Sequence, residues 1–152
     1  MHIKTVKPIN FLFFRTITKL SELNKFFHVA SELFKEASVR NLTITGPIHW
    51  HYQGFEGGDD KPFALEIALP ISETPQDYDG QFHFKRTEPF KCVSAVHEGN
   101  WMDMTGTYNE IMVFLASQRL KPSGLNRELY INVDFQDPSA NVTAVQVGIN
   151  AA

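Results

Sequence analysis

The chain has 152 residues, of which 43% are hydrophobic and 20% are charged. This length and composition argue against disorder and predict a soluble domain with a sizeable core. The formal net charge is −3 and no stripe of Lys and Arg is present, which argues against direct binding of nucleic acid, because neutralising phosphates requires clustered cations.

Cys92 is the only cysteine in the sequence, so no internal disulfide is expected, and this suits a reducing compartment. No apolar run approaches the length of a membrane span, and the apolar segment Phe11–Phe14 is too short for a signal peptide. We therefore expect a cytoplasmic protein that contacts no membrane. The 13 phenylalanines leave two interpretations open: a Phe-rich core, or rings that line a cavity for a flat apolar ligand.

In the first half of the chain, a β-prone apolar segment at 11–18 precedes a helical pattern at 22–39. The pattern consists of apolar residues three or four positions apart: Phe26, Phe27, Ala30, Leu33, Phe34 and Ala37. Residues 41–46 then interrupt the helix. Strands are predicted at 48–55 and 63–71, on either side of a glycine-containing turn.

The second half repeats this order of elements. A connector at 72–87, whose last residues alternate in a way compatible with a further strand, leads to a strand at 89–97. A helix with one apolar face then ends near Arg119, and residues 122–124 are predicted to terminate it because they contain Pro and Gly. Two further strands complete the chain, at 128–135 and 141–149.

A shift of 78 residues superimposes the two halves of the sequence. It aligns residues of the helix, the break and the last two strands: Gly46 with Gly124, Tyr52 with Tyr130, Leu33 with Ile111, and Ile67, Leu69 and Ile71 with Val145, Val147 and Ile149. One shift serves all these elements without a gap, which favours duplication over coincidence. We therefore predict one domain over 1–152, with repeats at about 8–72 and 88–150.

The predicted fold is of the α+β class: two β-α-β-β units join into an antiparallel sheet with two helices on one face. A single unit would leave a sheet edge and an apolar face unsatisfied, so the two copies should meet around a pseudo-twofold axis. A groove is expected between the helices. The strands that follow each helix should form its floor.

Four side chains are predicted to point into that groove. The 78-residue shift places Trp50 at the symmetry position of Glu128, and strand alternation puts Tyr52 beside Trp50 and Tyr130 beside Glu128. A carboxylate in an apolar groove loses solvation, so it must accept hydrogen bonds, take up a proton or pair with a cation. In the alternative interpretation, Glu128 is a solvated strand residue and the aromatic residues are core.

Two motifs extend this pattern: His97-Glu98-Gly99-Asn100-Trp101 at the end of a strand, and Glu128-Leu129-Tyr130 after the second helix and Gly124. In this order the sequence resembles the GyrI-like, or AraC-type effector-binding, family over nearly its full length. The resemblance implies a binding cleft between the copies, in which Glu128 faces the ligand and aromatic rings receive lipophilic cations. Trp101 stands where the family usually has a tyrosine, so it keeps an aromatic wall but lacks a phenol hydroxyl.

The expected function is a stand-alone binding module for lipophilic, cationic or aromatic small molecules, linked to transcription regulation, without a cofactor. A homodimer or a partner protein stays open. The second candidate is a hydrolase of the same family that opens strained cyclopropane-bearing natural products, with Glu128 as general base and Trp50, Tyr52 and Trp101 stacking on the substrate. Two weaker candidates are capture of a protein through the acidic loop at 73–79 and haem binding through a histidine.

Histidines and acidic residues elsewhere are interpreted as structural. His49 and His51 form a His-x-His pattern on a strand, but no third ligand is evident nearby, so no metal site is predicted and both are expected to be half-exposed. Asp103 and Glu110 share one face of the second helix and are expected to be solvated. The sequence contains no nucleophile elbow and no phosphate-binding glycine loop.

Overall fold

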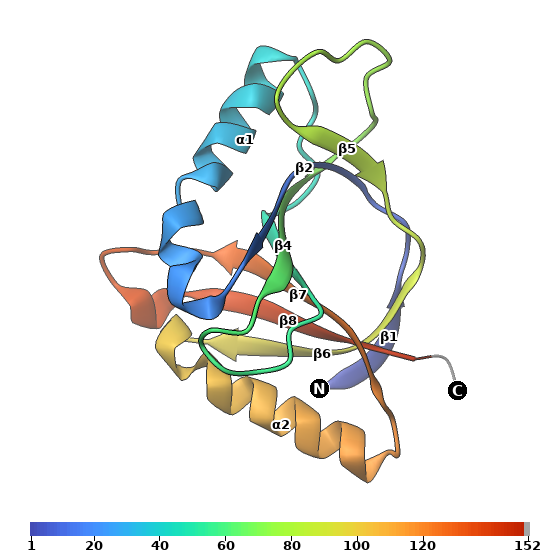
Figure 1. The fold of residues 1–152 in the computed structure, drawn as a ribbon, viewed down its shortest axis with the longest axis vertical. Coiled ribbons are helices and arrows are strands. Elements are labelled where there is room, and N and C mark those ends of the chain that lie inside the picture. The colour runs from blue at the N-terminus through green and yellow to red at the C-terminus, as the bar shows by residue number, and fades with distance from the viewer. Residues whose placement is uncertain (151–152) are drawn as a thin grey trace.

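The computed structural model describes residues 1–150, which form an eight-stranded antiparallel sheet with two α-helices (Figure 1). The strands are β1 (His2–Val6), β2 (Asn10–Thr18), β3 (His49–Gln53), β4 (Phe63–Ile71), β5 (His83–Arg86), β6 (Phe90–Glu98), β7 (Pro122–Asn132) and β8 (Val142–Ile149). The helices are α1 (Val29–Val39) and α2 (Met104–Ser117), with short 3₁₀ segments η1 (Leu20–Phe26), η2 (Trp101–Asp103) and η3 (Pro138–Ala140). The predicted α+β class is confirmed.

The strand order places the two halves of the chain symmetrically about one junction. Across the sheet the order is β1-β6-β8-β7-β3-β4-β2-β5, so β3 and β7 meet at the centre. There Trp50 pairs with Glu128, its own equivalent under the 78-residue shift. The registers of the β3–β4 and β7–β8 pairs are related by the same shift: Trp50 is paired with Ile67, and Glu128 is paired with Val145. The pseudo-twofold axis therefore passes through the Trp50–Glu128 pair.

The two outermost strands are exchanged between the halves. β1, which the sequence pattern does not predict, pairs with β6 of the second half, while β5 pairs with β2 of the first half. Four of the five β1 residues are exposed, so no alternation of buried and solvated side chains marks this strand in the sequence. β1 is a strand because its backbone pairs with that of β6.

The first helical segment is shorter than its sequence pattern predicts. η1 occupies the beginning of the predicted helix, and α1 starts only at Val29. Leu20, Leu23 and Phe26 are spaced three apart, which is the period of a 3₁₀ turn, and all three pack against the first core cluster. In α1 the buried residues are Val29, Leu33 and Ala37.

Both α-helices end through a left-handed residue rather than through proline and glycine. Asn41 and Arg119, equivalent under the 78-residue shift, have φ angles of 57° and 56°. The following N–H groups, of Leu42 and Leu120, both donate back into the last helical turn at 2.9 Å. The expected terminator at 122–124 is wrong: these residues begin β7, and Gly124 lies at a register shift inside it.

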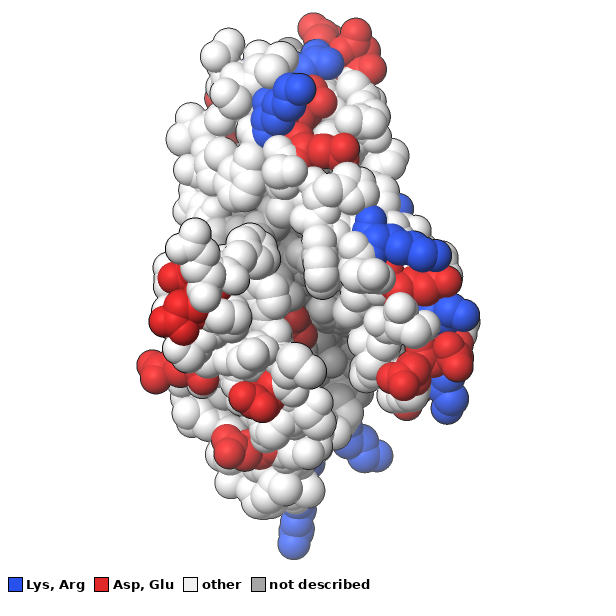
Figure 2. All heavy atoms as spheres, turned by 90° about the vertical axis from the view of Figure 1, so that its left-hand side faces the viewer, with Lys and Arg blue, Asp and Glu red and all other residues white. Residues whose placement is uncertain are grey.

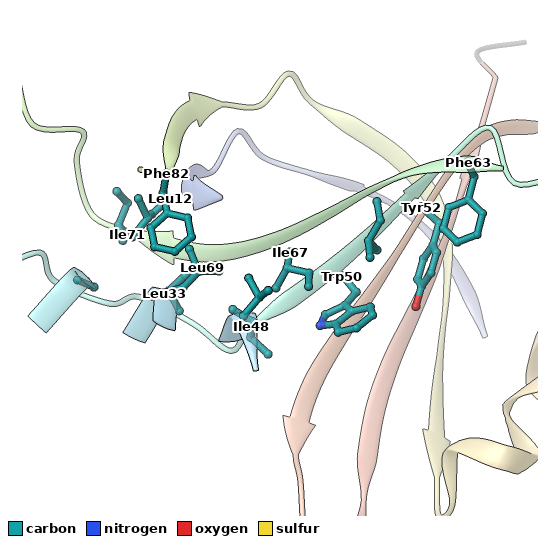
Figure 3. Close-up of a cluster of buried hydrophobic side chains, with 13 residues drawn as sticks. Leu12, Leu33, Ile48, Trp50, Tyr52, Phe63, Ile67, Leu69, Ile71 and Phe82 are labelled. Carbon is teal, nitrogen blue, oxygen red and sulfur yellow. The ribbon is translucent and has the colours of Figure 1, made fainter. Parts of the chain in front are cut away.

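Two hydrophobic clusters of the core lie on one face of the sheet. In the first, Leu33 of α1 packs over β2, β3 and β4; in the second, Ile111 of α2 packs over β6 and β8. Figure 3 shows the first cluster, with Trp50 and Tyr52 extending side by side from β3 at its edge. Both helices cover this one face, and β3 and β7 form the floor between them. In the described part of the chain, no helix has the length and apolar character needed to cross a membrane.

Candidate functional site

A buried carboxylate occupies the floor between the two helices. Glu128, in the middle of β7, is only 7% exposed. Tyr130 donates a hydrogen bond to its Oε1 at 2.6 Å, Tyr108 donates to its Oε2 at 2.5 Å, and Tyr52 lies at 3.4 Å from Oε1. These are three of the four tyrosines in the chain. Both carboxylate oxygens are therefore held by phenol groups from three different elements.

Local structure explains why these groups meet. Trp50 and Glu128 are directly paired across the β3–β7 junction, so their side chains share the helix-covered face. Tyr52 and Tyr130 follow two residues later on the same face of each strand. Tyr108 comes from α2, three residues before buried Ile111, so it points from the helix towards the sheet.

The electrostatics of Glu128 are dominated by burial. Loss of solvent raises the pKa of Glu128, while the three phenol donors and the nearby His97 oppose that rise. Burial, followed by the negative charge of Glu128, raises the pKa values of Tyr108 and Tyr130 well above the ordinary value, so these phenols stay protonated as donors. Within residues 1–150, Glu128 forms no ion pair with a lysine or arginine.

Aromatic rings from both halves surround the carboxylate. The Trp50 ring stands edge-on to Tyr130 at 6.3 Å between centroids, and the Trp101 ring approaches Tyr130 in the same manner at 5.4 Å. The indole N–H of Trp101 donates to Thr143 at 3.1 Å, which fixes the ring beside β8. The structure thus brings together all five residues singled out from the sequence.

Two exposed rings mark the outer rim of this arrangement. Phe27, which the sequence pattern assigned to the apolar helix face, is 60% exposed and lies 5.9 Å from the Trp50 ring. Phe135 is 83% exposed and lies 6.2 Å from the Trp101 ring. Figure 2 shows the helix-covered side hollowed near its middle, with red atoms of an acidic residue visible inside the hollow. Apolar rings around such a hollow are typical of a ligand site.

Tyr108 is the site residue that sequence reasoning does not select. The sequence pattern marks it only as one of several residues on the inner face of the second helix. A phenol group on an otherwise aliphatic helix stripe is a usable signal, because a buried hydroxyl needs a hydrogen-bond partner. The partner itself, Glu128, lies 20 residues away and becomes visible only when α2 is packed on the sheet.

The expectation for the histidine pair is wrong. His49 and His51 are each 2% exposed, not half-exposed, and they lie on the opposite face of the sheet against Phe11. Nδ1 of His49 and Nε2 of His51 are 3.1 Å apart. Burial lowers the pKa of His49 to about 3, so this ring is neutral at physiological pH. Among residues 1–150, no group of three His, Cys, Asp or Glu side chains is placed to hold a metal ion.

Solved structures share this fold at low sequence identity. The C-terminal domain of EcmrR is 17% identical with a TM-score of 0.81, and the match covers 99% of this chain and 97% of that one. In the EcmrR–DNA complex, the identity is 15%, the TM-score is 0.82 and coverage is 99% of this chain; this chain spans 57% of that EcmrR chain. SAV2435 bound to tetraphenylphosphonium is 11% identical with a TM-score of 0.63, covering 99% of this chain and 93% of that one.

A fourth structure is named a hydrolase. The hydrolase encoded by lin2189 from Listeria innocua is 15% identical with a TM-score of 0.70, and the match covers 98% of this chain and 91% of that one. No curated protein matches the sequence. At these identities the solved structures show the fold alone.

The fold and the aromatic site between two helices define a small-molecule binding domain. The family model of the GyrI-like small molecule binding domain matches residues 1–147. The chain therefore belongs to the GyrI-like family, as the two sequence motifs predicted.

Proposed function

We propose that this domain binds lipophilic, cationic small molecules between its two halves, and that Glu128 supplies the charge that attracts them. The observation that carries the proposal is the burial of Glu128 without a cationic partner in residues 1–150. A buried carboxylate is costly unless it is paired, and a positively charged guest would provide the pair.

The surrounding groups suit such a guest. The phenols of Tyr108 and Tyr130 hold the carboxylate oxygens in place, so the negative charge is positioned before a ligand arrives. The indoles of Trp50 and Trp101 offer faces for cation–π contacts, each on the order of 0.5–2 kcal/mol. SAV2435, which shares the fold, was solved bound to tetraphenylphosphonium, a lipophilic cation, and this supports the ligand class.

A role in transcription regulation belongs to the same proposal. EcmrR, whose C-terminal domain has this fold, was solved in complex with DNA. The net charge of the chain is −3, and its sequence contains no stripe of Lys and Arg of the kind that neutralises phosphates. We infer that it would report ligand binding to a DNA-binding partner rather than read DNA itself.

The proposal is tested by comparing methyltriphenylphosphonium with triphenylphosphine oxide, a neutral compound in which an oxygen replaces the methyl group, so that size and shape nearly match. Trp50 and Trp101 are the only tryptophans in the chain and both lie at the site, so intrinsic fluorescence reports occupancy directly. The cation is expected to bind at least about tenfold more tightly, because it gains a charge partner as well as ring contacts. Equal affinities for the two compounds would refute the proposed role of charge.

The phenols are expected to contribute measurably to this affinity. Tyr130→Phe removes one donor from Glu128 and makes the ionised carboxylate harder to maintain, so cation affinity should fall by about tenfold or more. Tyr78→Phe is the matched control, because Tyr78 is the fourth tyrosine and its hydroxyl accepts from the N–H of Phe82, away from the site. Isothermal titration with tetraphenylphosphonium measures both variants. If both variants lost cation affinity to a similar extent, the loss would not depend on the hydrogen bond to Glu128.

The second candidate activity is hydrolysis of strained cyclopropane-bearing compounds, with Glu128 as general base and aromatic stacking by Trp50, Tyr52 and Trp101. The observation in its favour is that two similar structures from Listeria innocua are named hydrolases. However, the phenol hydrogen bonds to both Glu128 oxygens stabilise the ionised carboxylate and oppose the rise of its pKa, which weakens it as a general base. Mass spectrometry of a compound recovered after incubation separates the two functions: binding returns it intact, and hydrolysis returns it with one water added.

A further inference from the structure

A second cavity lies on the face of the sheet that points away from the helices. It has a volume of about 280 Å³ and lies between β3, β7 and the segment that joins β5 to β6. Its lining combines charged and apolar side chains: His51, Glu66, Lys85, Phe90, Leu125 and Arg127. Because strand neighbours alternate between faces, Arg127 points into this cavity while Glu128 points into the aromatic site. The two sites are therefore on opposite sides of one sheet.

Arg127 is a buried cation with no anion beside it. The residue is 3% exposed, and its guanidinium carbon stacks over the Phe90 ring at 4.0 Å from the centroid. Its Nε and Nη1 atoms have no hydrogen-bond partner among residues 1–150, and Arg127 forms no ion pair there. Burial lowers the pKa of Arg127 to about 10, which leaves it charged at neutral pH. Buried guanidinium groups are ordinarily paired.

The other charges around the cavity do not satisfy Arg127. Glu66 is engaged by Lys85 and, at 2.7 Å, by Arg15. Glu88 also lines the cavity, but it is exposed and forms no ion pair with Arg127. His51 is buried, and burial lowers its pKa well below the ordinary value, so it is neutral and does not pair with Arg127. Among residues 1–150, no carboxylate that lines the cavity therefore forms an ion pair with the buried guanidinium of Arg127.

We propose that this cavity is a second binding site, which takes a small oxyanion, a carboxylate or a phosphate, on the guanidinium of Arg127. The planar fork of a guanidinium matches both groups geometrically and binds them through charge-assisted hydrogen bonds. Lys85 and His51 line the same cavity and can add donors to the anion. The cavity volume lies at or below the lower end of the range for drug-sized ligands, about 300–1,000 Å³, so a small anion fits better than a large one.

The site is tested by thermal unfolding of the whole chain in inorganic phosphate or in sodium acetate, each titrated over the millimolar range with ionic strength held constant by chloride. A saturable rise in Tm is expected for the wild type with at least one of the two anions. Arg127→Gln should abolish that rise. Arg86→Gln is the matched control, because Arg86 is exposed and hydrogen-bonds to Asn10 outside the cavity, so it should respond as the wild type does.

Two further measurements keep the test decisive if Arg127→Gln folds poorly. In the wild type, the ¹⁵N resonance of the Arg127 side-chain Nε–H should shift with the same saturation curve as Tm. Glu128→Gln should leave the anion response unchanged, which separates this site from the aromatic one. Absence of any saturable Nε shift with both anions, or equal Tm rises in wild type and Arg127→Gln, would overturn the proposal.

Discussion

Glu128→Gln is expected to weaken binding of tetraphenylphosphonium by at least about 100-fold at neutral pH, while changing binding of triphenylphosphine oxide by less than about twofold. Removing one partner of a buried charge pair typically costs about 3–5 kcal/mol, and 100-fold corresponds to about 2.7 kcal/mol. Glutamine keeps the size of the side chain, and its oxygen can accept from one of the phenols of Tyr108 and Tyr130 while its NH2 group donates to the other. The loss should therefore reflect charge rather than shape.

The pH dependence gives the same prediction a second readout. Because burial raises the pKa of Glu128, the empty site holds a protonated carboxyl over a wider acidic range than a solvated glutamate does. Cation affinity should rise with pH through this raised pKa and then level off, and Glu128→Gln should remove the rise.

The contribution of Glu128 to folding stability should change with pH in the opposite direction. A raised folded-state pKa favours the folded protein at acidic pH, and this contribution is lost as pH increases from about 4.5 through the raised value.

Glu110→Gln is the matched control for both readouts. It makes the same chemical change on an exposed position of α2, so both the affinity and its pH dependence should equal those of the wild type. Calorimetric titrations at several pH values, in two buffers of different protonation enthalpy, would also detect the proton released by Glu128 on binding. If Glu128→Gln bound the cation as tightly as the wild type, the carboxylate would have no part in recognition.

Leu33→Ala and Ile111→Ala are each expected to lower the free energy of unfolding by about 2–5 kcal/mol, the usual range for such truncations in a packed core. The two residues are equivalent under the 78-residue shift, and both side chains are 0% exposed, one in each core cluster. Their losses should be of similar size because each removes the central contact of a helix with the sheet. Chemical denaturation monitored by circular dichroism measures both.

The same pair of variants tests whether the chain unfolds as one domain, which stays a prediction. The sheet is continuous across the β3–β7 junction, so we propose that damage in either half destabilises both. Trp101→Phe leaves Trp50 as a probe of the first half, and Trp50→Phe leaves Trp101 as a probe of the second. Both probes should report the same midpoint in each background. Separate midpoints would show two cooperative units.

Val113→Ala serves as the control for these stability changes. Val113 lies on α2 two residues after Ile111 but is 70% exposed, so its truncation should change the free energy of unfolding by no more than about 0.5 kcal/mol. A loss comparable to that of Ile111→Ala would indicate that substitution anywhere in α2 is harmful, and the comparison of the two halves would then fail.

The amino-acid sequence by itself determined the repeated order of one strand, one helix and two strands, the duplication and the family. It also determined that Trp50 and Glu128 occupy equivalent positions, because β3 and β7 obey one uninterrupted shift and strand alternation assigns their faces. These features depend on the spacing of apolar residues along the chain, which can be read from the sequence without the structure.

Only the tertiary structure decided which residues from distant elements meet. Tyr108 reaches Glu128 because α2 packs on β6 and β8. β1 forms a strand because it pairs with β6. His49 and Arg127 look like residues of solvated strand positions, yet the arrangement of the whole sheet buries them on its second face. Burial of a side chain depends on all the elements around it, and no local pattern contains that information.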